Sequence, residues 1–423
     1  MFKHFLAKTG TYWKKLGPGL VTGAADDDPS GIATYSQIGA GYGFKYLWLS
    51  IFSFPLMSIV QEMCARIALV TGRGLATNIK QHYSKRTLHV VILLLFLANT
   101  FNIGADLGAM AQAVRLIIPV PAMLTMIVIG FIIIVSEIFL SYQKYAKYLK
   151  WVTLALLTYV ATIFFVHLPA GEILRGTFLP TIFFSKDTLL IITAVLGTTI
   201  SPYLFFWQTS QEVEEQILEG KVTVAARHGT NDQEVKDMRA DVWVGMFFSN
   251  FVMFCIIAVC AATLHANGIT TIDSAAQAAN ALRPFAGNAA YILFALGIIG
   301  TGFLAIPVLA GSTSYAVAES FGWKEGLYRK WFQARAFYGA IVISIGCGLL
   351  INFLGIDPIK TLIYSAVLNG LIAPVVIYYI VHLASNGHVM GEFKNRTWYT
   401  WIGYTTFAVM VVASVATIIS FFL

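Results

Sequence analysis

Charge is scarce in this sequence of 423 residues. Only 12% of its residues are Asp, Glu, Lys or Arg, and 57% are hydrophobic, whereas a soluble protein carries about 25% charged residues. The apolar runs recur from end to end, so we predict an all-α polytopic membrane protein rather than a soluble domain with one anchor. No soluble region is long enough to fold alone, so residues 1–423 are expected to form a single transmembrane domain.

Other absences exclude several classes of protein. No HExxH motif and no Walker lysine is present, which removes zinc-hydrolase and nucleotide-driven mechanisms. The four cysteines lie in apolar segments without a CxxC pair, so neither a disulfide framework nor a thiolate metal site is expected. The net charge of +7 comes without basic stretches interleaved with aromatics, so we expect no nucleic-acid partner and no cofactor. The basic N-terminus lacks the apolar core and cleavage site of a signal peptide.

Eleven segments are long and apolar enough to cross a bilayer, which requires about 20 residues each. The first, sixth and eighth are interrupted by Gly, Pro or polar residues. The longest expected loops cover 211–239 and 266–284, the second read as a short amphipathic surface helix. The predicted spans are 17–43, 46–71, 88–117, 122–142, 148–168, 187–217, 239–266, 286–319, 332–354, 358–383 and 397–422.

The Lys and Arg residues predict the orientation of these spans. Of the 28 Lys and Arg, 21 fall in the N-terminus and every second loop after it, 6 fall on the opposite side, and Arg66 lies within a span. Cytoplasmic loops carry an excess of these residues. We therefore expect an integral membrane protein, of a prokaryotic plasma membrane, with a cytoplasmic N-terminus and an extracellular C-terminus.

The first span contains the stretch whose transfer into the bilayer costs the most free energy, DDDPSGIAT at 26–34. A charge at the bilayer centre costs roughly 2.5–3.5 kcal/mol on insertion scales, and a helix interior cannot keep its hydrogen-bond ladder through Pro29. Charge and a broken helix at one depth suggest an ion site. On a helix, Asp26, Asp27 and Asp28 would splay about 100° apart, so they cannot all face one ion.

The sixth span contains a second break of the same kind. Its sequence GTTISPY at 197–203 again places a proline among small polar residues in mid-span. Two interrupted segments at corresponding places in two halves are typical of inverted-repeat transporters, whose site lies between the breaks at the midplane. We assign repeat one to about 17–168, repeat two to about 187–383, and an extra helix to about 397–422.

The GPG run at 17–19 and the two Pro-centred runs resemble those of the Nramp divalent-metal transporters. The resemblance covers nearly the whole chain and implies the LeuT-type fold, a 5+5 inverted repeat with an eleventh helix and with the first and sixth helices broken. Asp28 stands at the family's metal-binding aspartate. The family's asparagine, methionine and histidine in the motifs Asp-Pro-Gly-Asn and Met-Pro-His are replaced here by Gly31, Ser201 and Tyr203.

These departures favour a hard, hydrated ion. Without a thioether the ligands are oxygens, which suit Mg²⁺, Mn²⁺ or Ca²⁺, and smaller side chains leave room for the waters that Mg²⁺ retains. The pattern resembles the Nramp-related magnesium transporter branch. The expected metal site comprises Asp28, Gly31, Thr198, Ser201 and Tyr203. Vestibule or surrounding positions are Asp26, Asp27, Ser30 and Ala366, the last replacing a family glutamine.

In the third span, Asp106 and Ala109 align with the proton-pathway segment of the family, in which Ala109 replaces an acidic residue. Transport is therefore expected not to be coupled to protons. The alternatives are a proton-coupled Mn²⁺ or Fe²⁺ carrier, a carrier of amino acids or organic cations with the same fold, and, remotely, an intramembrane aspartyl enzyme using Asp28 and Asp106. Against a ligand role, Asp28 is also read as a helix cap, and Tyr203 as either a partner of a hydrating water or a space filler.

Overall fold

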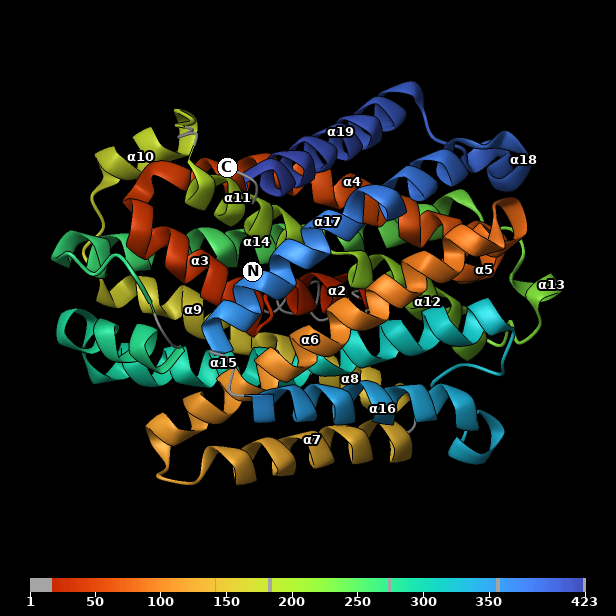
Figure 1. Cartoon of the computed structure of the whole chain (residues 1–423). Helices are drawn as coiled ribbons and strands as arrows, with labels where there is room; N and C mark the ends of the chain where they lie inside the picture. Colours follow the sequence, from red (N-terminus) through yellow and green to blue (C-terminus); the bar gives the residue numbers. More distant parts are fainter. Residues whose placement is uncertain (1–16, 141, 182–184, 273–274, 355–357, 421–423) are drawn as a thin grey trace, which may run out of the picture.

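The computed structural model describes residues 17–140, 142–181, 185–272, 275–354 and 358–420, and the basic segment 1–16 lies outside them. Within these ranges the chain is entirely helical, with long helices running side by side across the molecule (Figure 1). Nine helical segments are long and apolar enough to span a membrane among the described residues. The broken first helix and the shorter apolar helix Arg335–Ile351 occupy the two remaining predicted ranges.

The helices fall close to the predicted ranges. The first span is α2 (Pro18–Asp26) and α3 (Pro29–Tyr42), and the sixth is α11 (Lys186–Thr199) and α12 (Pro202–Leu218). The fifth span is made of short α and 3₁₀ segments between Tyr142 and Phe165. The remaining spans are α4 (Trp48–Thr71), α6 (Lys85–Ile117), α7 (Ala122–Phe139), α14 (Asp232–Thr263), α15 (Ala275–Phe321), α16 (Arg335–Ile351), α17 (Pro358–Ser385) and α19 (Thr397–Ser420).

Both prolines begin a helix rather than kink one. Pro29 is the first residue of α3 and Pro202 is the first residue of α12. The first helical position tolerates proline because its N–H would have no partner in the helix anyway, and its fixed φ suits the helix. Each span is therefore interrupted by a short non-helical stretch, at Asp27-Asp28 in the first and at Ile200-Ser201 in the sixth.

Of three expectations about boundaries, two are met and one is wrong. The eighth span is interrupted at Gly287, the second residue of its predicted range, where φ is 76° and the helix is kinked. The short helix expected in 266–284 begins at Ala275, and this kink separates it from the rest of α15. The expected loop 211–239 shrinks because α12 extends to Leu218 and α14 begins at Asp232, which leaves only the short helix α13 (Val224–Arg227) between them.

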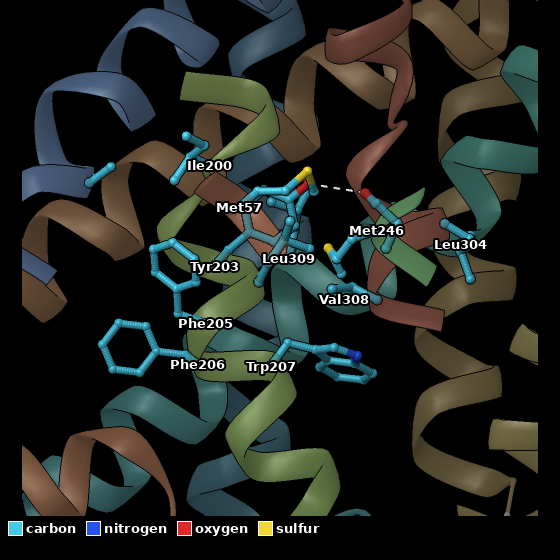
Figure 2. Packing of buried hydrophobic residues seen from close by; sticks show 14 of the residues in the cluster. Met57, Ile200, Tyr203, Phe205, Phe206, Trp207, Met246, Leu304, Val308 and Leu309 are labelled. Carbon is cyan, nitrogen blue, oxygen red and sulfur yellow. Dashed lines mark hydrogen bonds between the residues drawn. The ribbon is translucent and has the colours of Figure 1, made fainter. Parts of the chain in front are cut away.

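The two broken helices lie inside the bundle, and α7 and α19 lie at opposite edges of it (Figure 1). Helix α2 packs along α14 and also contacts α12 and α15, whereas α3 packs against α14, α17 and α11. Four aromatic side chains of α12, Tyr203, Phe205, Phe206 and Trp207, are buried, with Phe205 and Phe206 pointing away from Val308 of α15 (Figure 2). Contacts of α12 with α2 and of α11 with α3 hold the two broken spans next to each other.

Candidate metal site at two helix breaks

Asp28 lies at the centre of the first break and has no solvent-exposed surface. It is the N-cap of α3, and its Oδ1 accepts hydrogen bonds from the Gly31 amide (2.6 Å) and the Ser30 hydroxyl (2.8 Å). The cap expected as the structural alternative is therefore present. A carboxylate has about four lone-pair positions, so these bonds orient Asp28 without using all of its acceptor capacity.

The other oxygen of Asp28 is held by a residue that the sequence analysis missed. Asn102 of α6 donates its amide to Asp28 Oδ2 at 2.7 Å, and Ser365 of α17 donates to Asn102 Oδ1 at 2.7 Å. All three side chains are buried. The sequence did contain a signal for this role: Asn102 is an asparagine in the middle of an apolar run. It lies four residues before Asp106 and therefore on the same helix face. Helices α6 and α17 thus fix the rotamer of the carboxylate in the break.

Gly31 marks the point where the two breaks meet. A Cβ atom added there would lie 3.2 Å from the Asp26 carbonyl oxygen, 3.2 Å from Thr198 Oγ1 and 3.4 Å from Asp28 Oδ1. The Thr198 hydroxyl is buried and has no hydrogen-bond partner among the described residues. Three oxygens from the two broken spans therefore converge closely beside Gly31, where a side chain would crowd them, and oxygen is the donor that hard cations prefer.

Ser201 and Tyr203 are turned away from that point. The Ser201 hydroxyl donates to the carbonyls of Gly197 and Thr198, within its own span. The Tyr203 hydroxyl donates to the Ala25 carbonyl of α2 at 3.0 Å (Figure 2). Tyr203 thus ties α12 to α2, a role not considered from the sequence.

The three consecutive aspartates have different surroundings. Asp26 ends α2 and its Oδ2 accepts from the Ser249 hydroxyl at 2.5 Å. Asp27 lies in the non-helical stretch, with both oxygens buried and without a hydrogen-bond partner. The expected splay of about 100° does not apply, because only Asp26 lies in a helix. Among the described residues no Lys or Arg forms an ion pair with any of the three.

The remaining predicted positions surround the breaks. Asp106 of α6 is fully buried, and the backbone N–H of Ser30 lies near its carboxylate without meeting strict hydrogen-bond geometry; no other described residue bonds to its oxygens. Ala109 is buried on the same helix. Ala366 of α17 is a close-packing position, because a Cβ on Gly197 of α11 would come within 2.1 Å of the Ala366 carbonyl oxygen.

In the part of the chain that the structure describes, no three His, Cys, Asp or Glu side chains are grouped closely enough to hold a metal ion. The breaks therefore offer one oriented carboxylate, backbone oxygens and a hydroxyl rather than a closed cage of ligands. Such a set suits an ion that keeps part of its water shell.

Two other buried acids have structural partners. Glu62 pairs with Arg66 at 4.0 Å, four residues on along α4, but its closer partners are Arg239 at 2.9 Å and the ring N–H of Trp243 at 2.8 Å. The hydroxyl of Tyr145 donates to Glu137 at 3.2 Å. Neither acid adjoins the breaks through these contacts.

An all-helical bundle with a carboxylate at one of two adjacent helix breaks defines a membrane transporter of the LeuT fold. Comparison with known proteins agrees: the family model described as "Natural resistance-associated macrophage protein-like" matches residues 19–420. The chain therefore belongs to the Nramp family, as the two motifs predicted.

Curated relatives and solved structures support this assignment. The chain is 26% identical over 402 residues to the divalent metal cation transporter MntH of Klebsiella pneumoniae, covering 94% of this chain and 91% of that protein. A crystal structure of the Eremococcus coleocola manganese transporter superposes with a TM-score of 0.76 at 16% identity, covering 97% and 86% of the two chains. The nucleobase-cation-symport-1 transporter Mhp1 gives 0.60 at 14% identity, covering 96% and 90%. The predicted fold is confirmed, and these relatives are transporters rather than enzymes.

Proposed function

We propose that this chain moves divalent metal cations across the membrane by alternating access, with Mg²⁺ as the favoured ion and Mn²⁺ as a further substrate. The observation that carries the proposal is the convergence of the Asp26 carbonyl, Thr198 Oγ1 and Asp28 Oδ1 beside Gly31, where a Cβ atom would lie 3.2–3.4 Å from all three. These oxygens come from both broken helices, as expected where such a transporter binds its ion.

The donor set supports a preference for hard ions. The three atoms nearest to a Cβ atom at Gly31 are oxygens, and the hydroxyl of Ser201 replaces the thioether found at this place in the family motif. Mg²⁺ dehydrates reluctantly and usually binds through one or two carboxylates while keeping several waters. Asp28 would supply the charge, and Asp26 and Asp27 would add to the negative potential around it.

The ion would enter down its electrochemical gradient. A negative-inside potential contributes about 2.3 kcal/mol per charge per 100 mV. This direction assumes the orientation predicted from Lys and Arg, with the N-terminus in the cytoplasm of a prokaryotic cell. It needs no proton coupling, in line with the replacement of the family's histidine and second acidic residue by Tyr203 and Ala109.

A second candidate is a proton-coupled Mn²⁺ carrier. Two observations favour it: Asp106 is retained and buried without a hydrogen bond from a described side chain, and the similar structures include a manganese transporter. The two functions differ in ion selectivity and in proton movement, and both properties can be measured in proteoliposomes.

The first test compares Mg²⁺ uptake by proteoliposomes containing the wild type, Asp28→Ala or Asp187→Asn. Asp187 is exposed at the start of α11 and serves as the control carboxylate. We expect Asp28→Ala to lose saturable uptake and Asp187→Asn to keep it. Normal uptake by Asp28→Ala would overturn the site assignment.

The second test measures competition and internal pH together. We expect Mg²⁺ at a concentration equal to that of Mn²⁺ to reduce Mn²⁺ uptake measurably, with no acidification inside the vesicles. Internal acidification in step with uptake, without competition by Mg²⁺, would favour the proton-coupled Mn²⁺ carrier instead.

A further inference from the structure

A polar cavity of about 440 Å³ lies on the Lys- and Arg-rich side of the bundle. It begins at Trp207, one turn after Tyr203 on α12, and reaches the exposed residues Glu219 and Lys147. Its walls come from α2, α8 (Tyr142–Val152), α12 and α14. We call it the vestibule. The polar end of α12, part of which the sequence placed in the loop 211–239, is a buried wall of this vestibule.

Four of the nine charged side chains that line the vestibule are compensated by one another or by backbone N–H groups. Lys221 pairs with Glu234 at 3.0 Å and with Glu219 at 3.3 Å. Asp241 accepts hydrogen bonds from the backbone N–H groups of Gly17 (2.9 Å), Gly19 (2.6 Å) and Leu20 (3.2 Å). The contacts of Asp241 hold the positive end of α2. Lys221 and Asp241 are therefore both engaged and do not balance another charge in the vestibule.

Glu212 is not compensated by an ion pair or by backbone N–H groups of the described residues. Its side chain lines the vestibule and the residue is only 6% exposed. It forms no ion pair with any described residue, and the charged groups that act on it most strongly are the carboxylates Asp241, Glu215 and Glu219. Its Oε1 accepts one hydrogen bond, from Gln208 Nε2 at 2.8 Å. Lys147, Lys150 and Lys221 line the same cavity, but none of them forms an ion pair with Glu212. A buried carboxylate without a cation beside it is costly, so a cation bound next to Glu212 would stabilise it.

Amide oxygens flank Glu212 one turn away on each side. Gln208 Oε1 and Gln216 Oε1 are buried and have no hydrogen-bond partner. Gln216 lines the vestibule and is 2% exposed, and its Nε2 is held by the Leu69 carbonyl at 3.1 Å, which fixes the direction of the amide. The buried indole N–H of Trp207 also lines the vestibule without a partner, so this wall is prepared to bind water.

We propose that Glu212, with the amide oxygens of Gln208 and Gln216, forms a second site for a hydrated divalent cation, which an ion occupies between the breaks and the solvent on this side. The proposal rests on the proposed function and adds a subsite to it. A single carboxylate with neutral oxygens suits an outer, hydrated ion. This site therefore binds more weakly than Asp28, and filling it first places an ion one step from the breaks.

The test is a Mn²⁺ binding titration, read by electron paramagnetic resonance, on full-length protein in nanodiscs with excess K⁺. We expect two classes of bound Mn²⁺ in the wild type. Glu212→Gln should lose the weaker class, or weaken it at least about tenfold, and keep the tighter one. Asp28→Ala should show the reverse. The matched control is Glu219→Gln, which removes the same charge from the exposed rim of the same helix and should change the weaker class less than about twofold.

Three results would overturn the subsite: one class of bound Mn²⁺ in the wild type that Asp28→Ala abolishes, equal effects of Glu212→Gln and Glu219→Gln, or displacement of the weaker class by K⁺. Each leaves the proposed function standing. The proposed function fails separately, if the tight class survives Asp28→Ala. A crystal soaked in Mn²⁺ locates both ions by anomalous scattering, and the weaker peak must lie beside Glu212.

Discussion

Asn102 donates a 2.7 Å hydrogen bond to Asp28 Oδ2, and through Ser365 it joins three helices at the first break. The Asp28 carboxylate is therefore already oriented by hydrogen bonds before any ion binds. Its rotamer is fixed from one side by Asn102 and from the other by the first turn of α3. Partners of this kind orient a metal ligand and are nearly as important as the ligand itself.

Asn102→Ala should therefore weaken Mg²⁺ affinity about tenfold, because Asp28 Oδ2 loses its only protein donor among the described residues. The measurement is the KM for uptake together with the binding constant. The control is Asn99→Ala, three residues earlier on α6, whose amide bonds the Leu309 carbonyl and the hydroxyls of Ser312 and Thr313. Both variants should lose stability, but only Asn102→Ala should lose affinity. An equal loss of affinity would mean that Asn102 acts only through packing.

Gly31→Ala should impair ion binding, because the added methyl group would lie 3.2 Å from both the Asp26 carbonyl oxygen and Thr198 Oγ1. It would occupy the space proposed for the ion and one of its waters. Gly346→Ala is the matched control, since nothing lies within 4 Å of a Cβ added there. We expect uptake to fall several-fold more for Gly31→Ala than for Gly346→Ala. Unchanged uptake by Gly31→Ala would place the ion elsewhere.

Asp241→Ala should destabilise the protein by about 1–3 kcal/mol, because three backbone N–H groups at the start of α2 lose their acceptor. Asp237→Ala, an exposed residue one turn earlier on α14, should change stability by less than about 0.5 kcal/mol. Thermal unfolding in detergent measures both. Similar melting temperatures for the two variants would show that Asp241 does not hold α2.

Glu325, in the loop between α15 and α16, provides a pH-dependent prediction. Burial and the nearby carboxylates of Glu319 and Glu214 raise its pKa from 4.5 to about 9. A carboxyl whose pKa is higher in the folded state stabilises the fold below its unfolded pKa, and this contribution is lost as pH rises from about 4.5 to about 9. Glu325→Gln should therefore raise the melting temperature at pH 8 by at least about 2 °C and have little effect at pH 4.5.

The control for Glu325 is Glu392→Gln, at an exposed position near α19. It should leave the melting temperature unchanged at both pH values. A lower melting temperature of Glu325→Gln at pH 8 would contradict this prediction. It would show that the ionised carboxylate has a partner and stabilises the folded protein.

The sequence was sufficient for the parts of this molecule that depend on local chemistry. Hydropathy located the helical segments of the bundle, and Pro29 and Pro202, each among small polar residues, located both breaks because proline is best accommodated in the first turn of a helix. Proline alone was not sufficient, since Pro55 and Pro374 lie inside α4 and α17. The hydrogen bonds to Asp28 from its own next turn also follow from N-cap preferences. The division into two repeats and the ligand roles remain predictions.

What the sequence could not provide depends on contacts between distant segments. Asn102 and Ser365 lie 263 positions apart, and nothing local to either predicts that they meet at Asp28. The bond from Tyr203 to Ala25 likewise depends on how α12 packs against α2. The burial of Glu212 was missed for the same reason, because a polar helix end is solvated unless other helices enclose it.

Helix α2 touches α14 through bare backbone. A Cβ on Gly19 would lie 2.6 Å from the Val242 nitrogen, and one on Gly23 would lie 2.3 Å from the Gly245 carbonyl. No interlocking side chains have to be withdrawn at these points for α2 to move. The side-chain hydrogen bonds that join α2 to neighbouring helices lie at its two ends. Asp241 accepts from its first turn, and at the other end Ser249 donates to Asp26 and Tyr203 donates to the Ala25 carbonyl. A shift of α2 as one unit would therefore have to break hydrogen bonds at both ends.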